Sequence, residues 1–454
     1  RNKGDIKLNK ISFLSQTDTA TQLKLNDNEL YSFKHKEKLS SSIPYSNPYW
    51  LNEAHIPGMY TVNQQQLIGQ AENESATVVV FDIDVEGLNL KIPRKLIYKS
   101  TDPVKGEVYR PFEVLPPATV NINEKVIVFN SNAQKSLQLT VKANAADISG
   151  KLALSVPTGW DVSVKNPDFK LVNKGDEQVI DVVITPRNTQ LGGELKASLS
   201  IANNTYTKSI QRIEYDHIPY QFILADAKAK LVFLDLKKTG TNIGYIPGAG
   251  DDVPACLKQI GYTVTMLTDE LLSKEDLSKY TAIVTGVRAY NTNERLPIYY
   301  SKLMEYVGNG GNLIVQYNTN GRGEQVTNKI GPYPFTISRD RVTDEHAEIK
   351  ITNPNHSALT FPNVITDKDF EGWIQERGIY FASDLDKNYE TVFSMHDANE
   401  KASDGSLILA KYGKGNFVYS GLVFFRELPA GIAGAYRLFA NLLSLPPNET
   451  EKIK

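Results

Sequence analysis

The sequence is poor in cysteine, with a single one, Cys256, in 454 residues. One thiol excludes an internal disulfide framework and any zinc site built from several cysteines. Cys256 falls inside a predicted helix at residues 251–262, beside Leu257 and Ile260, and a structural thiol buried on such an apolar face is inert. We therefore expect no catalytic pair of cysteine and histidine in this chain.

Neither an excess of positive charge nor a long apolar run is present. Lys and Arg number 50 and Asp and Glu number 52, which gives a formal net charge of -2. A chain without a broad basic surface neutralises few phosphates, so nucleic acid is not an expected partner. The apolar segment at residues 421–445 is interrupted by Arg426, Glu427 and Arg437 and falls short of the ~20 apolar residues that cross a bilayer. We expect no membrane span.

The length points to several domains, because one hydrophobic core rarely grows much beyond ~150 residues. With 41% hydrophobic and 22% charged residues, the composition is that of an ordinary globular protein. The chain begins at Arg1 on a polar segment without a signal-like apolar stretch, so we expect it to be a piece of a longer polypeptide.

The first half of the chain has an apolar period of two, seen at residues 76–99 and 135–144. Such alternation between turn residues predicts antiparallel strands with one buried face. Pro116 and Pro117 cannot continue a central strand and predict a boundary there. We therefore expect two β-sandwich domains, at residues 1–116 and 117–219, with Trp160 in the core of the second.

The pattern changes after about residue 220. Residues 230–236 read as a buried strand, residues 251–262 as a helix, and further strands and helices alternate after them. This alternation predicts an α/β domain at residues 220–454, with a parallel sheet between two layers of helices. The fold class expected for the whole chain is multidomain β plus α/β.

Ligands of open parallel sheets bind at the carboxyl ends of the strands. Three polar segments follow predicted strands, at residues 242–254, 287–294 and 317–324. The strand after Gly310 and Gly311 ends in a sharp exit of the kind that presents a nucleophile, but it carries neither Cys nor Ser. The candidate ligand-binding residues at these ends are Asp251, Asp252, Arg288, Tyr290, Asn291, Gln316, Tyr317 and Asn318.

The first of these segments contains GAGDD at residues 248–252, which is not a dinucleotide fingerprint because GxGxxG is missing. We expect Gly248 and Gly250 to form a tight loop and Asp251 or Asp252 to cap the following helix. A phosphate site is the less favoured alternative.

Two later segments are rich in polar residues. Residues 337–349 include Glu345 and His346, but neighbouring residues of a strand face opposite ways, so a salt-bridged loop is favoured over a metal site. Residues 369–381 combine aromatic rings with charged groups, which suits either a sugar site or an internal clamp; both interpretations stay open. The candidates here are Trp373, Gln375, Glu376, Arg377 and Tyr380.

The last domain resembles the flavodoxin-like, class I glutamine amidotransferase-like fold, including its ThuA-like branch. The motifs are YTAIVTGV at residues 280–287, YVGNGGNLIVQYN at 306–318 and YGKGNFVYSGL at 412–422. Active relatives carry Cys at the exit where this chain has Tyr317 and Asn318. Neither side chain forms the acyl intermediate, so the resemblance implies a domain without amidotransferase chemistry.

Most of the chain is similar to the region that follows the catalytic domain in large bacterial PIG-L (LmbE-like) deacetylases. The motifs are YSNPYWL at residues 45–51, KGEVYRPFEVLPP at 105–117, DRVTDEHA at 340–347, GWIQERGIYF at 372–381 and FFRELPAGIAGAYRLFANLL at 424–443, which contains the candidate Arg426. The middle segment resembles immunoglobulin-like modules of secreted glycan-processing enzymes.

The catalytic domain of that family binds zinc through a His-Pro-Asp-Asp motif and hydrolyses N-acetyl groups of amino sugars. No such motif occurs in this sequence. The resemblance therefore implies a non-catalytic accessory region, with zinc only in a preceding domain, a glycan or amino-sugar ligand, and a periplasmic or extracellular location. No cofactor is expected in the chain itself.

Three functions follow as hypotheses. The first is an accessory region that binds or positions a glycan. The second is an enzyme with an unrecognised site made of Glu345, His346, Glu376 and Arg377, and the third is docking onto the deacetylase domain or dimerisation through aromatic residues at 332–335 and 424–429.

Overall fold

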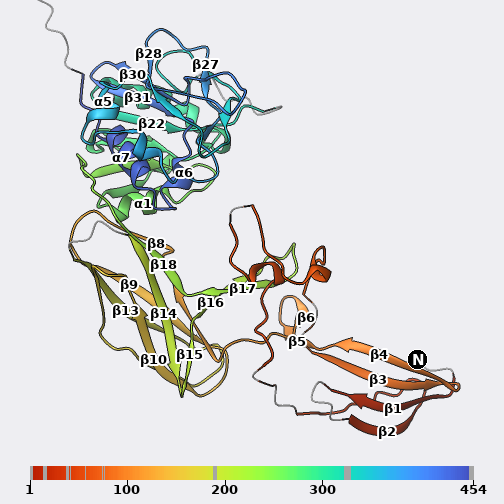
Figure 1. The fold of residues 1–454 in the computed structure, drawn as a ribbon. Coiled ribbons are helices and arrows are strands. Elements are labelled where there is room, and N and C mark those ends of the chain that lie inside the picture. The colour runs from red at the N-terminus through yellow and green to blue at the C-terminus, as the bar shows by residue number, and fades with distance from the viewer. Residues whose placement is uncertain are drawn as a thin grey trace, which may run out of the picture.

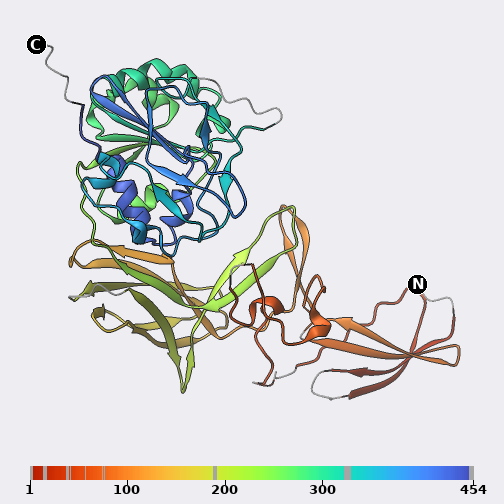
Figure 2. The ribbon, with the colours of Figure 1, turned by 45° about the horizontal axis from the view of Figure 1, so that its top comes forward.

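The computed structural model describes residues 4–13, 18–36, 40, 42–56, 58–73, 75, 77–187, 192–321 and 329–448. The chain is β-rich and multidomain, as the sequence predicts. Figures 1 and 2 show three parts that follow one another: an open sheet near the N-terminus, a sandwich, and a rounded C-terminal part with helices. Among the described residues, no helix has both the length and the apolar character needed to cross a bilayer.

In the described part of residues 1–116 the strands form one antiparallel four-stranded sheet and one two-stranded ribbon, rather than the sandwich that the sequence predicts there. In spatial order the strands of the sheet are β2 (Asp18–Leu25), β1 (Ile6–Ser12), β3 (Val78–Val85) and β4 (Leu88–Lys95). Every side chain of β3 is only partly buried, and β4 is exposed at all positions but one. The alternation therefore predicted strands correctly, although among the described residues of this sheet only Leu8 and Ile11 of β1 are buried.

Two ribbons lie between this sheet and the sandwich (Figure 1). One is β5 (Ile97–Asp102) with β6 (Gly106–Pro111), and the other is β16 (Lys208–Ile213) with β17 (Gln221–Asp226). Ion pairs join residues of the two ribbons, Arg110 to Glu214 and Lys105 to Asp216. The short 3₁₀ helices η1 (Tyr49–Leu51) and η2 (Gln65–Leu67) belong to the loop before β3.

The sandwich has two sheets over a shared core. The first, in spatial order, is β12 (Asp168–Leu171), β10 (Ile148–Ser155), β14 (Gly193–Ile201), β18 (Lys228–Phe233) and β8 (Val126–Phe129), with β15 (Asn204–Tyr206) beside β14. The second is β11 (Trp160–Val164), β13 (Glu177–Pro186), β9 (Lys135–Ala143) and β7 (Ala118–Ile122). Trp160 is buried, as predicted, with its ring centre 5.0 Å from that of Phe129.

The change from sandwich to C-terminal part comes later than the sequence predicts. Residues 230–236 were expected to begin the α/β domain, but β18 pairs antiparallel with β14 and parallel with β8, inside the sandwich. The first strand of the following sheet is β19 (Asn242–Ile246), which was predicted as a loop. A short apolar strand fits either sheet by pattern alone, so only its partners decide where it belongs.

The C-terminal part is built on a seven-stranded sheet. Five strands are joined by parallel ladders, and the last two are antiparallel. In spatial order they are β20 (Thr263–Met266), β19, β21 (Ala282–Thr285), β22 (Asn312–Gln316), β31 (Gly415–Ser420), β30 (Leu407–Tyr412) and β28 (Tyr389–Thr391).

Helices cover both faces of this sheet. Residues of α1 (Val253–Gln259) and α7 (Ala433–Leu443) share a core with Val284, whereas α2 (Asp269–Lys274) and α4 (Tyr300–Gly308) share another with Ile283. Neighbouring residues of a strand face opposite ways, so the two cores lie on opposite faces. Shorter helices are α3 (Ala289–Thr292), α5 (Ser357–Thr360), α6 (Phe424–Glu427), η3 (Leu277–Lys279), η4 (Leu296–Tyr299) and η5 (Asp367–Phe370).

Between β22 and β30 the chain forms an irregular layer of small ladders. Their strands are β23 (Thr336–Ile337) with β27 (Ala382–Ser383), β24 (Arg341–Val342) with β26 (Gly378–Ile379), and β25 (Ile349–Ile351) with β29 (Phe393–Met395). The pairing of β24 with β26 brings the segment at residues 340–347 next to the segment at 372–381. Both were candidate regions in the sequence.

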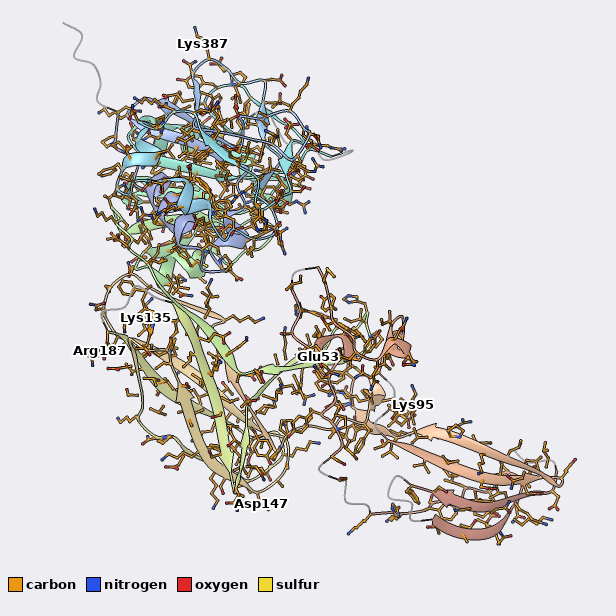
Figure 3. The ribbon with its side chains drawn as sticks, in the orientation of Figure 1. Glu53, Lys95, Lys135, Asp147, Arg187 and Lys387 are labelled. Atoms are coloured by element: carbon orange, nitrogen blue, oxygen red, sulfur yellow. The ribbon has the colours of Figure 1, made fainter. Side chains whose placement is uncertain are left out.

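Hydrogen bonds fasten the sandwich to the C-terminal part. The side-chain amide of Gln259 accepts from Val128 N at 2.8 Å and donates to Val126 O at 3.2 Å, so it extends the edge of β8. Lys135, labelled at the top of the sandwich in Figure 3, donates to the carbonyls of Val128 and Gln259.

Candidate functional site

The loop after β19 is held by the carboxylate of Asp251. It accepts hydrogen bonds from the Tyr245 hydroxyl at 2.6 Å, from Val253 N at 3.0 Å and from Val287 N at 3.2 Å. Gly248 lies so close to the next loop that a Cβ there would sit 2.1 Å from Val287 O. The GAGDD segment is thus a tight turn. Asp251 binds the first backbone N–H of helix α1 and the next loop, whereas the N-cap residue Asp252 makes no side-chain capping hydrogen bond.

Buried amides connect the ends of neighbouring strands. Gln316, 1% exposed, donates to the Tyr245 hydroxyl at 3.0 Å and to Thr285 O at 3.1 Å. Asn318 accepts from Tyr290 N at 2.9 Å, and Asn291 exchanges two hydrogen bonds with Thr319. Gln316, Asn318 and Tyr290 are buried and Asn291 is partly buried, and their hydrogen bonds join the strand ends. Two of their buried atoms, Gln316 Oε1 and the Tyr290 hydroxyl oxygen, have no hydrogen-bond partner among the described residues.

Tyr317 is the residue at the exit of β22. Its ring is parallel to that of Tyr380, with centres 5.8 Å apart and planes 7° apart, and its centre lies 5.4 Å from that of Phe425. Tyr317 O accepts a hydrogen bond from Arg288 N at 2.8 Å. Three aromatic rings from β22, the end of β26 and α6 therefore meet at this exit.

Charged groups border these rings. Arg426 Nε lies 3.0 Å from Glu376 Oε1, and its guanidinium carbon is 4.8 Å from the centre of the Phe425 ring. Burial raises the pKa of the Tyr317 hydroxyl, which Arg288 and Arg426 oppose and Glu376 supports. The structure therefore brings five predicted residues together, which with Phe425 we call the strand-end cluster: Arg288, Tyr317, Glu376, Tyr380, Phe425 and Arg426.

Trp373 and Arg377 form an internal clamp, the second of the two interpretations left open by the sequence. Trp373 is 3% exposed and its Nε1 donates to Asp369 O at 3.0 Å. Arg377 is 6% exposed and donates to Ala347 O at 3.0 Å and to Phe370 O at 2.6 Å. Neither side chain has a free face for a sugar.

Glu427 is a buried carboxylate that the sequence reasoning missed. It is 0% exposed, and both of its oxygens lie 3.2 Å from Ile374 N, which donates to them. Burial raises the pKa of this carboxyl to about 8, although Arg377 and Arg426 oppose the shift. Its sequence signal is an acidic residue inside the apolar segment at residues 421–445.

Glu345 and His346 lie in a turn, within the segment for which the sequence favours a loop. Ligand atoms of Asp344, Glu345 and His346 approach within 4.8 Å of one another, so the argument from strand alternation does not apply. The His346 side chain is 84% exposed, whereas a general acid or base works in a shielded pocket. Asp252 and Gln375 are exposed as well.

Two further expectations concern aromatic surfaces and the thiol. Phe335 packs on Tyr389 and Tyr419, with ring centres 5.5 and 5.1 Å away, and Phe424 is 0% exposed. These two phenylalanines therefore pack in the core rather than form a docking surface.

Cys256 is 4% exposed, and burial raises the pKa of its thiol to about 11, whereas an activated thiol has a lowered pKa. Residues 322–324 of the third predicted strand-end segment lie outside the described residues.

Comparison with known proteins adds no family. No protein-family model matches the chain, and no curated protein matches it. Among solved structures, the VesB protease of Vibrio cholerae aligns at 10% identity over 34% of this chain and 44% of its own, with a TM-score of 0.17. A xyloglucanase of family GH5 from Bacteroides ovatus aligns at 9% identity over 44% and 45%, with a TM-score of 0.16.

The α-2-macroglobulin of E. coli aligns at 12% identity over 34% of this chain and 8% of its own, with a TM-score of 0.17. The chain thus covers less than half of the length of each of these three proteins.

Proposed function

We propose that this chain is a non-catalytic accessory region of a PIG-L (LmbE-like) N-acetyl-sugar deacetylase and that it binds or positions a glycan. In this proposal the sandwich is an immunoglobulin-like module and the C-terminal part is a degenerate amidotransferase-like domain of flavodoxin-like topology. The parent protein would act in the periplasm or outside the cell. The resemblance in sequence motifs supports these assignments.

The observation that carries the proposal is the group of aromatic rings at the exit of β22, where Tyr380 and Phe425 are partly buried. Tyr317, 8% exposed, is stacked on Tyr380 and tilted by 45° against Phe425. Aromatic faces bind the apolar faces of sugar rings, and the adjoining Arg426 and Glu376 offer donors and acceptors for hydroxyl groups. The same position in an amidotransferase would hold a nucleophile. A phenol of raised pKa is not one, so recognition fits this site better than catalysis.

Zinc has no role in this chain under the proposal. The His-Pro-Asp-Asp motif that would hold it does not occur in the sequence, and the turn at Asp344–His346 places its histidine almost entirely in solvent. Any hydrolysis of N-acetyl groups belongs to another domain of the parent polypeptide.

Calorimetric titration of the chain with chitotetraose, an oligomer of N-acetylglucosamine, tests the proposal. We expect saturable binding that Tyr380→Ala and Arg426→Ala each weaken by roughly tenfold. Arg341→Ala is the matched control, because Arg341 is also an ion-paired, half-exposed arginine but lies outside the strand-end cluster. Absence of binding, or equal affinity in all four proteins, would refute the proposal.

A further inference from the structure

A cavity of about 540 Å³ opens between the N-terminal loop and the two ribbons β5–β6 and β16–β17. This volume lies within the range of roughly 300–1,000 Å³ that small-ligand sites occupy. Lys95, labelled in Figure 3 where β4 meets the first ribbon, marks one side of it. The cavity is far along the chain from the strand-end cluster, and no part of that cluster lines it.

Hydrogen bonds between distant segments fix the walls of this cavity. Asn47, 9% exposed, accepts from Leu224 N at 3.0 Å and donates to Leu51 O at 3.1 Å. Ser46 N donates to Val114 O at 2.9 Å, and its hydroxyl accepts from Val114 N at the same distance. The loop at residues 44–51 is therefore bound to both β17 and the segment that follows the first ribbon, so the cavity is built by specific contacts.

One wall of the cavity, which includes Arg110, Glu113 and Tyr220, carries a network of charged and aromatic side chains. The guanidinium carbon of Arg110 lies 4.4 Å from the centre of the Tyr220 ring, and Arg212 binds the Tyr220 hydroxyl. Arg212 also lies 3.5 Å from Glu113, whose side chain is 16% exposed. Burial raises the pKa of the Glu113 carboxyl against the opposing effect of Arg212. These groups hold one another in fixed orientations at the wall.

Other groups at the cavity are available to a ligand. In the described part of the chain, the Lys95 ammonium, the Glu72 carboxylate and the Gln221 amide have no hydrogen-bond or ion-pair partner, and all three are exposed. Aromatic faces stand next to them, on Tyr45 at 40% exposure and Tyr109 at 54%, together with the partly buried Trp50. Charges of both signs are present, which favours a ligand without net charge.

We propose that this cavity binds a short, uncharged oligosaccharide. Sugar rings have apolar faces that stack on aromatic side chains and hydroxyl groups that both donate and accept hydrogen bonds. Trp50 and Tyr109 supply the faces, and Lys95, Glu72 and Gln221 supply donors and acceptors. This second site does not depend on the strand-end cluster.

Tryptophan fluorescence can report ligand binding in this cavity selectively, because one tryptophan lines it. The chain has three tryptophans, of which Trp160 and Trp373 are 5% and 3% exposed within cores and Trp50 lines the cavity. We expect saturable fluorescence changes when the full chain is titrated with cellotetraose or chitotetraose. Trp50→Phe should remove the optical change while calorimetry still shows binding, and Trp50→Ala and Lys95→Ala should weaken binding by about tenfold and a few-fold.

The same titration distinguishes binding in the cavity from binding at the strand-end cluster. Tyr380→Ala should leave the fluorescence titration unchanged, since Tyr380 is not part of the cavity. The inference fails if neither oligosaccharide gives a saturable signal up to about 10 mM. It also fails if the signal persists in Trp50→Phe, or if only strand-end variants lose binding; that last result would support the proposed function alone.

Discussion

The guanidinium carbon of Arg377 lies 5.9 Å from the centre of the Trp373 ring, and both side chains are buried. Arg377 donates to the carbonyls of Ala347, in the loop between β24 and β25, and of Phe370, at the end of η5. Through these hydrogen bonds the buried arginine holds together two segments of the irregular layer, which has little regular secondary structure.

Replacing this arginine should therefore cost stability. Arg377→Met leaves two buried carbonyls without donors, and we expect a loss of about 2–4 kcal/mol in the free energy of unfolding. Urea unfolding measures it. The control Arg341→Met, at a half-exposed arginine, should change the same quantity by about 0.5 kcal/mol or less. Equal effects of the two substitutions would contradict the clamp.

Glu427 should make stability depend on pH. Its pKa is about 8 in the folded protein against an ordinary value of 4.5, so the folded state binds the proton more tightly. The stabilisation is complete below pH 4.5 and is lost as the pH rises through 8. Relative to the wild type, Glu427→Gln should gain on the order of 2 kcal/mol between pH 5 and 8. Melting temperatures across this range measure it, and parallel curves for the two proteins would exclude the effect.

The thiol of Cys256 should be unreactive in the native protein. It is buried, and its pKa of about 11 leaves almost no thiolate at neutral pH. We expect iodoacetamide to label it at least ~100-fold more slowly than in urea-unfolded chain, as followed by mass spectrometry. Rapid native labelling, or capture by an electrophilic glutamine mimic, would reopen amidotransferase chemistry.

The junction at Gln259 should couple the unfolding of the sandwich to that of the C-terminal part. Gln259→Ala removes both hydrogen bonds to β8, at Val128 N and Val126 O, and should destabilise the junction by about 1–2 kcal/mol. Calorimetry should then show two transitions drawn further apart in temperature. Gln138→Ala is the control, because that amide pairs with Asp181 on an exposed face; a similar separation in this variant would argue against the coupling.

The sequence predicted well where local pattern and burial agree. In β9 the alternating apolar residues do face a core, Trp160 does lie between sheets, and Cys256 does lie on an apolar helix face. Each of these side chains needs only apolar neighbours of any identity in order to be buried. Local periodicity is then sufficient to assign the side chain to the interior.

The sequence failed where the outcome depends on distant partners. The apolar run at residues 230–236 fits either of two sheets, and β18 joined the sandwich because β8 and β14 are its partners. For Trp373 and Arg377 the sequence left a sugar site and an internal clamp both open, and the choice depends on backbone carbonyl oxygens of η5 and of Ala347, which accept hydrogen bonds from them. For Phe425 and Glu427 the sequence indicates only an aromatic segment and an interrupted apolar run, since their setting arises only when α6 meets the strand ends and the irregular layer.

The place of β18 decides how this polypeptide can be divided. β18 lies between β14 and β8, so a cut at residue 219 would remove from the sandwich the strand that joins β8 to β14. The C-terminal fragment would then carry β18 as an unpaired strand that can associate with other chains. A cut within residues 234–241 keeps both sheets whole. Fragments made at the first position should aggregate where those made at the second stay monodisperse.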